Sequence, residues 1–316
     1  MAKRTLEELN VIDDFLFHSM MTRNEKGEEF CRILLKTILN KEFKNVKVSV
    51  QKSTPGIDTD KHGIRLDAYI EVLPDTSPAG LTELSSESDI TANAEILSDI
   101  YDIEPNTYKD VSEARRTRYY HSLIDTKLLN SGISYDKLQN VVIIMILTYD
   151  PFGKDRMVYT MKNGCMEDSS IEYEDGNRTI YLYTRGTVGN PGKELQDMLK
   201  YLEHSTEENI KNKDIETIHR LMQEVKQDAK VGIKFMKSWE KDYILKRDGH
   251  KEGKITVLAE LIIKKTKKNL SFSEIANQLE EKETVLRPIY DVVLKYAPDY
   301  DMEKILDELC PERNWL

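Results

Sequence analysis

The sequence is poor in cysteine, and its cysteines form none of the patterns of a disulfide-rich or zinc-binding protein. Cys31, Cys165 and Cys310 are far apart, with no CxxC pair and no histidine nearby at ligand spacing. An odd number of isolated cysteines argues against a disulfide framework and against a structural zinc site. This cysteine usage fits a reducing, cytoplasmic location.

Long apolar segments are also missing. No run of apolar residues approaches the roughly 18 to 20 that a membrane-spanning helix needs, and the first residues, MAKRTLEELN, contain no apolar segment of a secretory signal. We therefore expect neither a membrane span nor secretion. The absence of a GxxxxGK[ST] loop argues against an ATPase, and the six scattered histidines support no Ser-His-Asp or Cys-His arrangement.

Charge is abundant but unevenly distributed. The 316-residue chain has a formal net charge of -10, which argues against the uniform coating of a nucleic acid because phosphate binding depends on Lys and Arg. Residues 226–268, however, hold 13 Lys plus Arg against 6 Asp plus Glu. This stretch is either a solvated helix face or a basic arm that serves an acidic core.

Hydrophobic periodicity predicts an α/β protein. Helical spacing occurs at 28–39 and 112–131, and alternation or continuous apolarity predicts strands at 46–50, 64–72, 99–104, 141–147, 156–160 and 178–184. The order gives an αβββαβ core with additional strands, followed by a C-terminal helical region. That order alone fits several folds, so residues on the strands must decide between them.

Composition divides the chain into three parts. We expect residues 1–204 to form one α/β domain, with 74–98, rich in Ser, Thr, Pro and acid, as a mobile insertion. Residues 205–248 are predicted as one long helix, ended by a break at Asp248-Gly249-His250. Residues 249–316 are predicted as a helical tail with a Ser271–Glu274 capping box. The tail could be plain packing, a DNA- or partner-binding element, or a dimerisation element.

Two carboxylates on different predicted strands could meet at a metal ion. Asp67 lies in a mostly apolar strand, and Glu104 ends the next one, where alternation places Asp102, Glu104 and Asn106 on one face. If the strands are neighbours, Asp67 and Glu104 can share Mg²⁺ or Mn²⁺, since hard cations prefer oxygen ligands. A D…ExN pattern also occurs by chance, and an Asp in a strand can simply mark an edge or a turn.

Several stretches resemble a known family: VIDDFLFHSMM, KHGIRLDAYIEV, YDIEPN, RRTRYYHSLIDTKLL and TYDPFGKDRMVYT. Over roughly residues 8 to 200 the chain resembles the PD-(D/E)XK nuclease family transposases, also called the Rpn family of recombination-promoting nucleases. The resemblance implies a restriction-endonuclease-like fold, divalent-metal-dependent DNA cleavage, and a link to DNA recombination or mobile elements. It also implies that Asp67 and Glu104 are the metal-binding carboxylates of the motif, with the backbone carbonyl of Pro105 as a further ligand.

The resemblance also points to residues around these carboxylates. Asn106 stands where the wider superfamily has lysine; an amide can orient the attacking water but supplies no positive charge.

Arg116, Arg118 and Tyr120 match the family's helix motif. Arg118 and Tyr120 could position the scissile phosphate, or Arg118 could pair with Asp110 or Glu113 while Tyr120 packs.

Glu28 or Glu29, on the first predicted helix, could supply the acidic residue that the superfamily often has before its first strand, but a solvated helix start favoured by the helix dipole is the preferred explanation.

Two functions from different classes follow. The first is a Mg²⁺-dependent DNA endonuclease in which Asp67 and Glu104 hold metal, Asn106 orients water and Arg118 binds phosphate. The second is a nuclease-fold protein with little or no turnover that acts as a DNA-binding or protein-interaction module. Asn106, Pro105 and the acidic net charge favour the second. Homodimerisation is compatible with both.

Overall fold

The computed structural model describes residues 4–54, 64–73, 99–109, 112–129 and 131–311, without the side chains of 50–54, 64–68, 73 and 242. The predicted insertion at 74–98 lies outside the described residues. The chain divides into two compact units, Met1–Gly232 and Ile233–Leu316.

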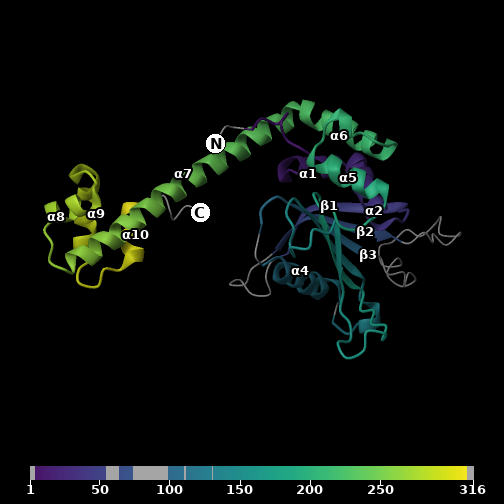
Figure 1. The fold of residues 1–316 in the computed structure, drawn as a ribbon, viewed down its shortest axis with the longest axis horizontal. Helices are drawn as coiled ribbons and strands as arrows, with labels where there is room; N and C mark the ends of the chain where they lie inside the picture. The colour runs from purple at the N-terminus through teal and green to yellow at the C-terminus, as the bar shows by residue number, and fades with distance from the viewer. Residues whose placement is uncertain (1–3, 55–63, 74–98, 110–111, 130, 312–316) are drawn as a thin grey trace. The chain divides into compact units, whose positions relative to one another are not determined.

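A six-stranded mixed sheet with the order β1-β2-β3-β4-β6-β5 forms the centre of the first unit (Figure 1). The strands β1, β2 and β3 pair antiparallel, β3, β4 and β6 pair parallel, and β5 is an antiparallel edge strand. Their bounds are β1 Asn45–Thr54, β2 Ile64–Leu73, β3 Asp99–Asn106, β4 Val141–Leu147, β5 Val158–Met161 and β6 Asn177–Tyr183. The predicted α/β class and the predicted strands are confirmed.

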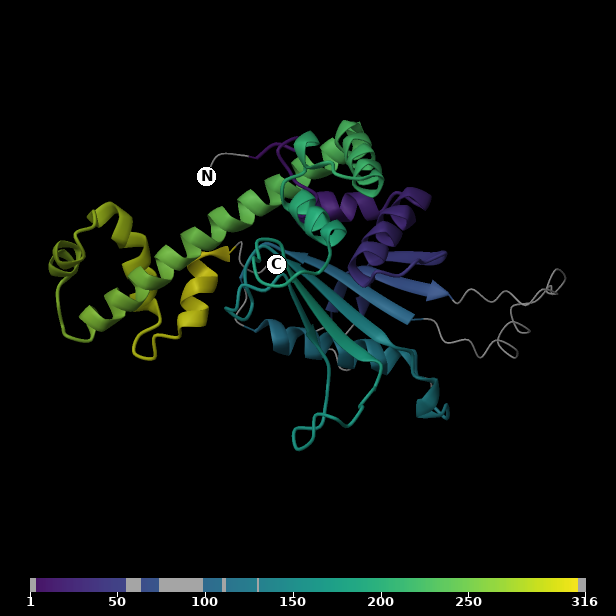
Figure 2. The same ribbon diagram turned by 45° about the vertical axis from the view of Figure 1, so that its right-hand side comes forward.

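Helices cover both faces of this sheet, as Figures 1 and 2 show. One face is covered by α4 (Glu113–Leu128), and the other by α1 (Asp14–Met21), α2 (Glu25–Leu39) and α5 (Lys193–Glu203). Every residue of β4 is buried, which explains why its sequence, VVIIMIL, is apolar throughout instead of alternating. Short 3₁₀ turns lie at Tyr135–Lys137 and Glu207–Asn209.

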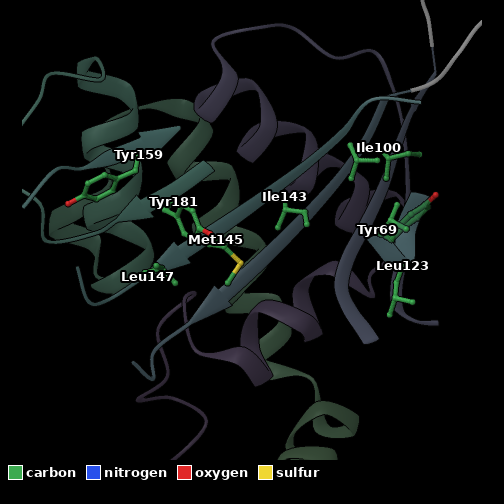
Figure 3. Packing of buried hydrophobic residues seen from close by; sticks show 10 residues of the cluster. Tyr69, Ile100, Leu123, Ile143, Met145, Leu147, Tyr159 and Tyr181 are labelled. Carbon is green, nitrogen blue, oxygen red and sulfur yellow. The ribbon is translucent and has the colours of Figure 1, made fainter. Parts of the chain in front are cut away.

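The α4-covered face contains a hydrophobic cluster that fixes the helix on the sheet. Ile143 and Met145 of β4 are fully buried with Tyr69 of β2, and Leu123 of α4 packs into the same cluster (Figure 3). Burying each such side chain stabilises the fold by about 1.5–3 kcal/mol relative to leaving it exposed. This packing determines which side of α4 points toward β3.

The helix predicted for residues 205–248 is wrong in both of its bounds. The chain forms α6 (Lys213–Gln227), breaks at Asp228, and continues as α7 (Ala229–Thr266). Asp228 stabilises the break because its carboxylate accepts a 2.8 Å bond from the Lys230 N–H and pairs with Arg23 at 2.8 Å. A glycine inside a helix costs only about 1 kcal/mol, so Gly249 does not interrupt α7.

The second unit packs three short helices against the end of α7: α8 (Phe272–Leu279), α9 (Glu283–Lys295) and α10 (Met302–Leu309). The predicted capping box of Ser271 and Glu274 is present at the start of α8. Buried Ile275, Leu286 and Val293 belong to one hydrophobic cluster. Within the described part of the chain, no helix has the length and apolarity to cross a membrane.

Candidate active site

Two carboxylates of β3 are enclosed beneath α4. Asp102 is fully buried and Glu104 is 4% exposed, and they lie opposite Ile143 and Met145 in the parallel register of β3 and β4. Because residues two apart in a strand share a face, both carboxylates lie on the face covered by α4. Ionised groups in such a place are costly unless opposite charge or hydrogen bonds compensate them.

Asp67 occupies the neighbouring strand, β2. Its side chain lies outside the described part of the structure. The antiparallel register pairs Tyr69 with Asp102. Carried two residues further along both strands, the same register would set position 67 opposite position 104. The backbone arrangement is therefore compatible with the predicted pairing of Asp67 and Glu104, which stays a prediction.

An arginine of α4 lies beside Glu104. The Arg116 guanidinium lies 3.6 Å from a Glu104 carboxylate oxygen and 3.8 Å from a carboxylate oxygen of Glu113. Burial acts to lower the pKa of Arg116, but the charges and phenol groups around it, Tyr120, Glu113 and Glu104 among them, outweigh burial and raise it. Arg116 is therefore a permanent positive charge beside Glu104.

Asn106 belongs to a hydrogen-bond network around Glu113. Its amide donates to the Glu113 carboxylate at 3.0 Å, and its carbonyl oxygen accepts from the Tyr108 N–H at 2.8 Å. The Tyr149 hydroxyl also donates to Glu113, at 2.5 Å. Both ends of the Asn106 side chain are thus engaged. The predicted water-orienting role stays a prediction.

Pro105 lies beyond the last described pair of the β2–β3 ladder, Tyr69 with Asp102, and opposite Ile146 of β4. Proline within a sheet is confined to positions where its missing N–H is not needed for a ladder bond. The predicted role of its carbonyl as a metal ligand stays a prediction.

The two helix residues predicted to hold phosphate lie on different sides of α4. Tyr120 packs against the sheet cluster, and its ring lies 5.6 Å from the Arg116 guanidinium. Arg118 is exposed and lines a separate groove with His121 and Asp125. Arg116, and not Arg118, is the arginine beside the buried carboxylates. The alternative pairing of Arg118 with Glu113 does not occur.

The candidate acids of the first helix lie far from this face. Glu28 and Glu29 belong to α2, which covers the opposite face of the sheet (Figure 1). Glu29 lies 3.9 Å from Arg32 on its own helix. Their positions support the simpler interpretation, a solvated helix start.

The residues present fit a hard cation in charge and in donor chemistry. Asp102, Glu104 and Glu113 are buried carboxylates that offer only oxygen donors, and the Arg116 guanidinium lies within 3.8 Å of Glu104 and Glu113. One oxygen of Glu113, Oε2, is buried and has no hydrogen-bond partner among the described residues. Among the described side chains, no three acidic, histidine or cysteine groups come close enough to form a metal site. Any such site in this region would thus need a ligand outside the described side chains, and Asp67 is the predicted one.

Sequence reasoning placed Asp102 on the correct face but gave it no role, and it missed the Glu113–Tyr149 bond. The spacing of Glu113 and Arg116, three residues apart on a helix, was a usable signal for an ion pair. Nothing local in the sequence points to Tyr149. No family model, curated protein or solved structure matches this chain.

Proposed function

We propose that the protein is a divalent-metal-dependent DNA endonuclease of the PD-(D/E)XK type, with a role in DNA recombination or mobile elements. The observation that carries the proposal is the buried group of acids on β3, Asp102 and Glu104, with the guanidinium of Arg116 only 3.6 Å from Glu104. The order of elements around it, α2, β1, β2, β3, α4 and β4, supports it because it follows the αβββαβ pattern of a restriction-endonuclease-like core.

In this proposal Asp67 and Glu104 hold Mg²⁺ or Mn²⁺, which would supply an activated water and neutralise charge on the phosphate. Arg116 takes the part that lysine has in the wider superfamily. Its planar fork can bind a phosphate oxygen and stabilise the charge that develops there. Glu113 positions Arg116 and Asn106 through the contacts described above.

A plasmid-nicking assay tests this proposal. Supercoiled DNA is incubated with the parent protein in Mg²⁺ or EDTA, and with Glu104→Gln, Asp67→Asn and the control Glu172→Gln, which changes an exposed loop acid. We expect Mg²⁺-dependent nicking by the parent and the control, and a loss of about a hundredfold or more in the two site variants. Metal-dependent nicking that is equal in all four proteins would show that Asp67 and Glu104 do not take part in cleavage.

A second function, a DNA-binding module without turnover, is favoured by one specific observation. Asn106 is engaged at both ends and Arg116 already lies against Glu104, so side chains assigned to the water and the metal already have protein partners. If the parent shows no metal-dependent nicking but retards DNA in a gel in the presence of EDTA, this alternative replaces the first.

A further inference from the structure

A groove lined by both polar and apolar side chains lies along the side of α4 that faces away from Arg116. It has a volume of about 400 Å³, within the range of small-molecule pockets. The helix contributes Arg118, His121, Ser122 and Asp125, whose spacing places them on one helical face. The opposite wall comes from β5, β6 and the segment around Phe152.

The charge of the groove suits an anion. Its charged lining residues are Arg118, Lys162, Arg178 and Asp125. Arg178 is held by Glu174 at 2.8 Å. Within the described residues neither Arg118 nor Lys162 has a carboxylate within ion-pair distance. Two cations of the groove are thus available to a ligand.

Two titratable groups, His121 and Asp125, also line the groove. Burial lowers the pKa of His121, although Asp175 and bonds to Asn177 and the Arg178 backbone oppose this, so the imidazole is neutral at pH 7. It also makes a 3.0 Å bond with Thr179. Burial raises the pKa of Asp125, opposed by a bond from Asn177 and reinforced by Asp175.

An aromatic ring is exposed in the same groove. Phe152 is 37% exposed. Its ring is held edge-on by Tyr159, with centroids 5.0 Å apart, and by Tyr181, with centroids 5.2 Å apart. Met161, 40% exposed, adds a second apolar surface. A cationic groove with an exposed ring is the combination that binds single-stranded nucleic acid, in which the ring stacks on a base.

The loop that carries Phe152 is fixed by Asp150. The Asp150 carboxylate accepts bonds from the Phe152 N–H at 3.0 Å, the Asp155 N–H at 2.6 Å and the Tyr159 hydroxyl at 2.7 Å. Burial acts to raise the pKa of Asp150, but these donors outweigh it and lower it to about 2. The ring is therefore preorganised, which reduces the entropy lost when a ligand binds.

We propose that this groove binds one nucleotide of an unpaired DNA strand, with the base against Phe152 and its phosphate between Arg118 and Lys162. That the strand is DNA rests on the proposed function; the groove itself rests on the contacts above. The groove would therefore give the protein a preference for substrates with an unpaired segment near the cleaved bond.

Fluorescence anisotropy tests the proposal on the full chain, with a labelled oligothymidine strand and EDTA present so that no cleavage occurs. Phe152→Leu keeps apolar volume but removes the ring, and Tyr135→Leu, at a ring that is 85% exposed outside the groove, is its control. We expect Phe152→Leu to weaken binding about tenfold and Phe152→Trp to preserve it. Met161→Glu, at an exposed position, should also weaken binding. It keeps the proposal testable if Phe152→Leu fails to fold.

Salt dependence tests the phosphate contact. Arg118→Gln should reduce the slope of log affinity against log salt by about 0.7, the value for one phosphate contact on a single strand. Arg115→Gln, on an exposed part of the same helix, should leave the slope unchanged. Suppose that Arg118→Gln lowers the salt slope but the Phe152 and Met161 variants bind the strand as tightly as the Tyr135 control does. The groove then holds an anion only, and the nucleotide proposal is overturned.

The two proposals fail in distinguishable ways. Normal metal-dependent nicking together with unchanged binding by Phe152→Leu and Met161→Glu overturns the groove and leaves the endonuclease. Absent nicking by the parent together with the expected binding losses overturns the endonuclease and leaves the groove.

Discussion

The two sides of α4 show how burial changes the use of similar residues. On the inner side, Glu113 and Arg116 are enclosed with Glu104, and the Arg116 guanidinium lies within 3.8 Å of both carboxylates. On the outer side, Arg118 is exposed and lines an open groove. An enclosed charge must be compensated by other groups of the fold, whereas an exposed charge remains available to bind a ligand. Substitutions on the inner side should therefore cost stability, and those on the outer side should cost binding.

The largest expected effect is that of Arg116→Met, which would leave Glu104 and Glu113 without their guanidinium. Removing one partner of a buried ion pair typically costs about 3–5 kcal/mol; we expect about 3 kcal/mol here because Arg116 is 25% exposed. Urea unfolding at pH 7 measures the change. Arg118→Met is the matched control and should shift stability by less than about 0.5 kcal/mol. Equal losses in both variants would remove the contrast between the two sides.

Tyr149→Phe sharpens the comparison by deleting one hydroxyl on the inner side. That hydroxyl donates to the nearly buried Glu113 carboxylate at 2.5 Å, and hydrogen bonds to charged groups contribute about 1.5–3 kcal/mol. We expect unfolding to become easier by about 1.5 kcal/mol in the same urea experiment. Tyr135→Phe, at an exposed ring, should be neutral, and a neutral Tyr149→Phe would show that the bond contributes nothing.

Asp150→Asn probes the loop at the outer groove through its pH dependence. The folded pKa of about 2 lies below the unfolded value of about 3.9, so the carboxylate stabilises the fold above pH 4, and this contribution is lost as pH falls toward 2. We expect about 1 kcal/mol at pH 7, discounted for partial exposure.

Urea unfolding of the parent and of Asp150→Asn at a series of pH values measures it. The difference in stability between the two proteins should shrink between pH 4 and pH 2. A difference that does not vary with pH would contradict the lowered pKa.

The strands were predictable because their burial is regular. Alternation in β3 placed Asp102, Glu104 and Asn106 on one face, and the structure has the first two buried there. The continuous apolarity of residues 141–147 indicated a strand covered on both sides, as β4 is. In both cases the local period of the sequence determines which face meets the core.

The arginine assignment shows where sequence reasoning stopped. Residues two apart on a helix point about 200° apart, so Arg118 and Tyr120 cannot act on the same phosphate from one face. Arg116 and Tyr120, four apart, do share a side, and the ring lies 5.6 Å from the guanidinium. The helical period could have excluded the first pairing, but the side that faces β3 is decided by packing of residues such as Leu123.

The long-helix prediction failed for a different reason. An apolar stripe runs through the sequence from Ile215 to Met236, but the structure buries only its first part: Ile215 is fully buried, whereas Ile233 and Met236 are 55% and 60% exposed. Periodicity indicates that residues share a face, not that anything covers that face. The break itself depends on Asp228 and its distant partner Arg23, which no local pattern reveals.

The smallest expected effect is the pH dependence that His121 gives to the outer side of α4. Because burial lowers its folded pKa below the unfolded value of about 6.5, the folded state binds fewer protons, so stability is complete above pH 6.5 and decreases as pH falls below it. His121→Gln removes that dependence and should change stability at pH 7 by under about 1 kcal/mol. An NMR titration of the His121 imidazole gives the pKa directly. A midpoint at or above about 6.5, the ordinary value for histidine, would contradict the burial of this imidazole in the groove and would weaken the contrast between the two sides of α4.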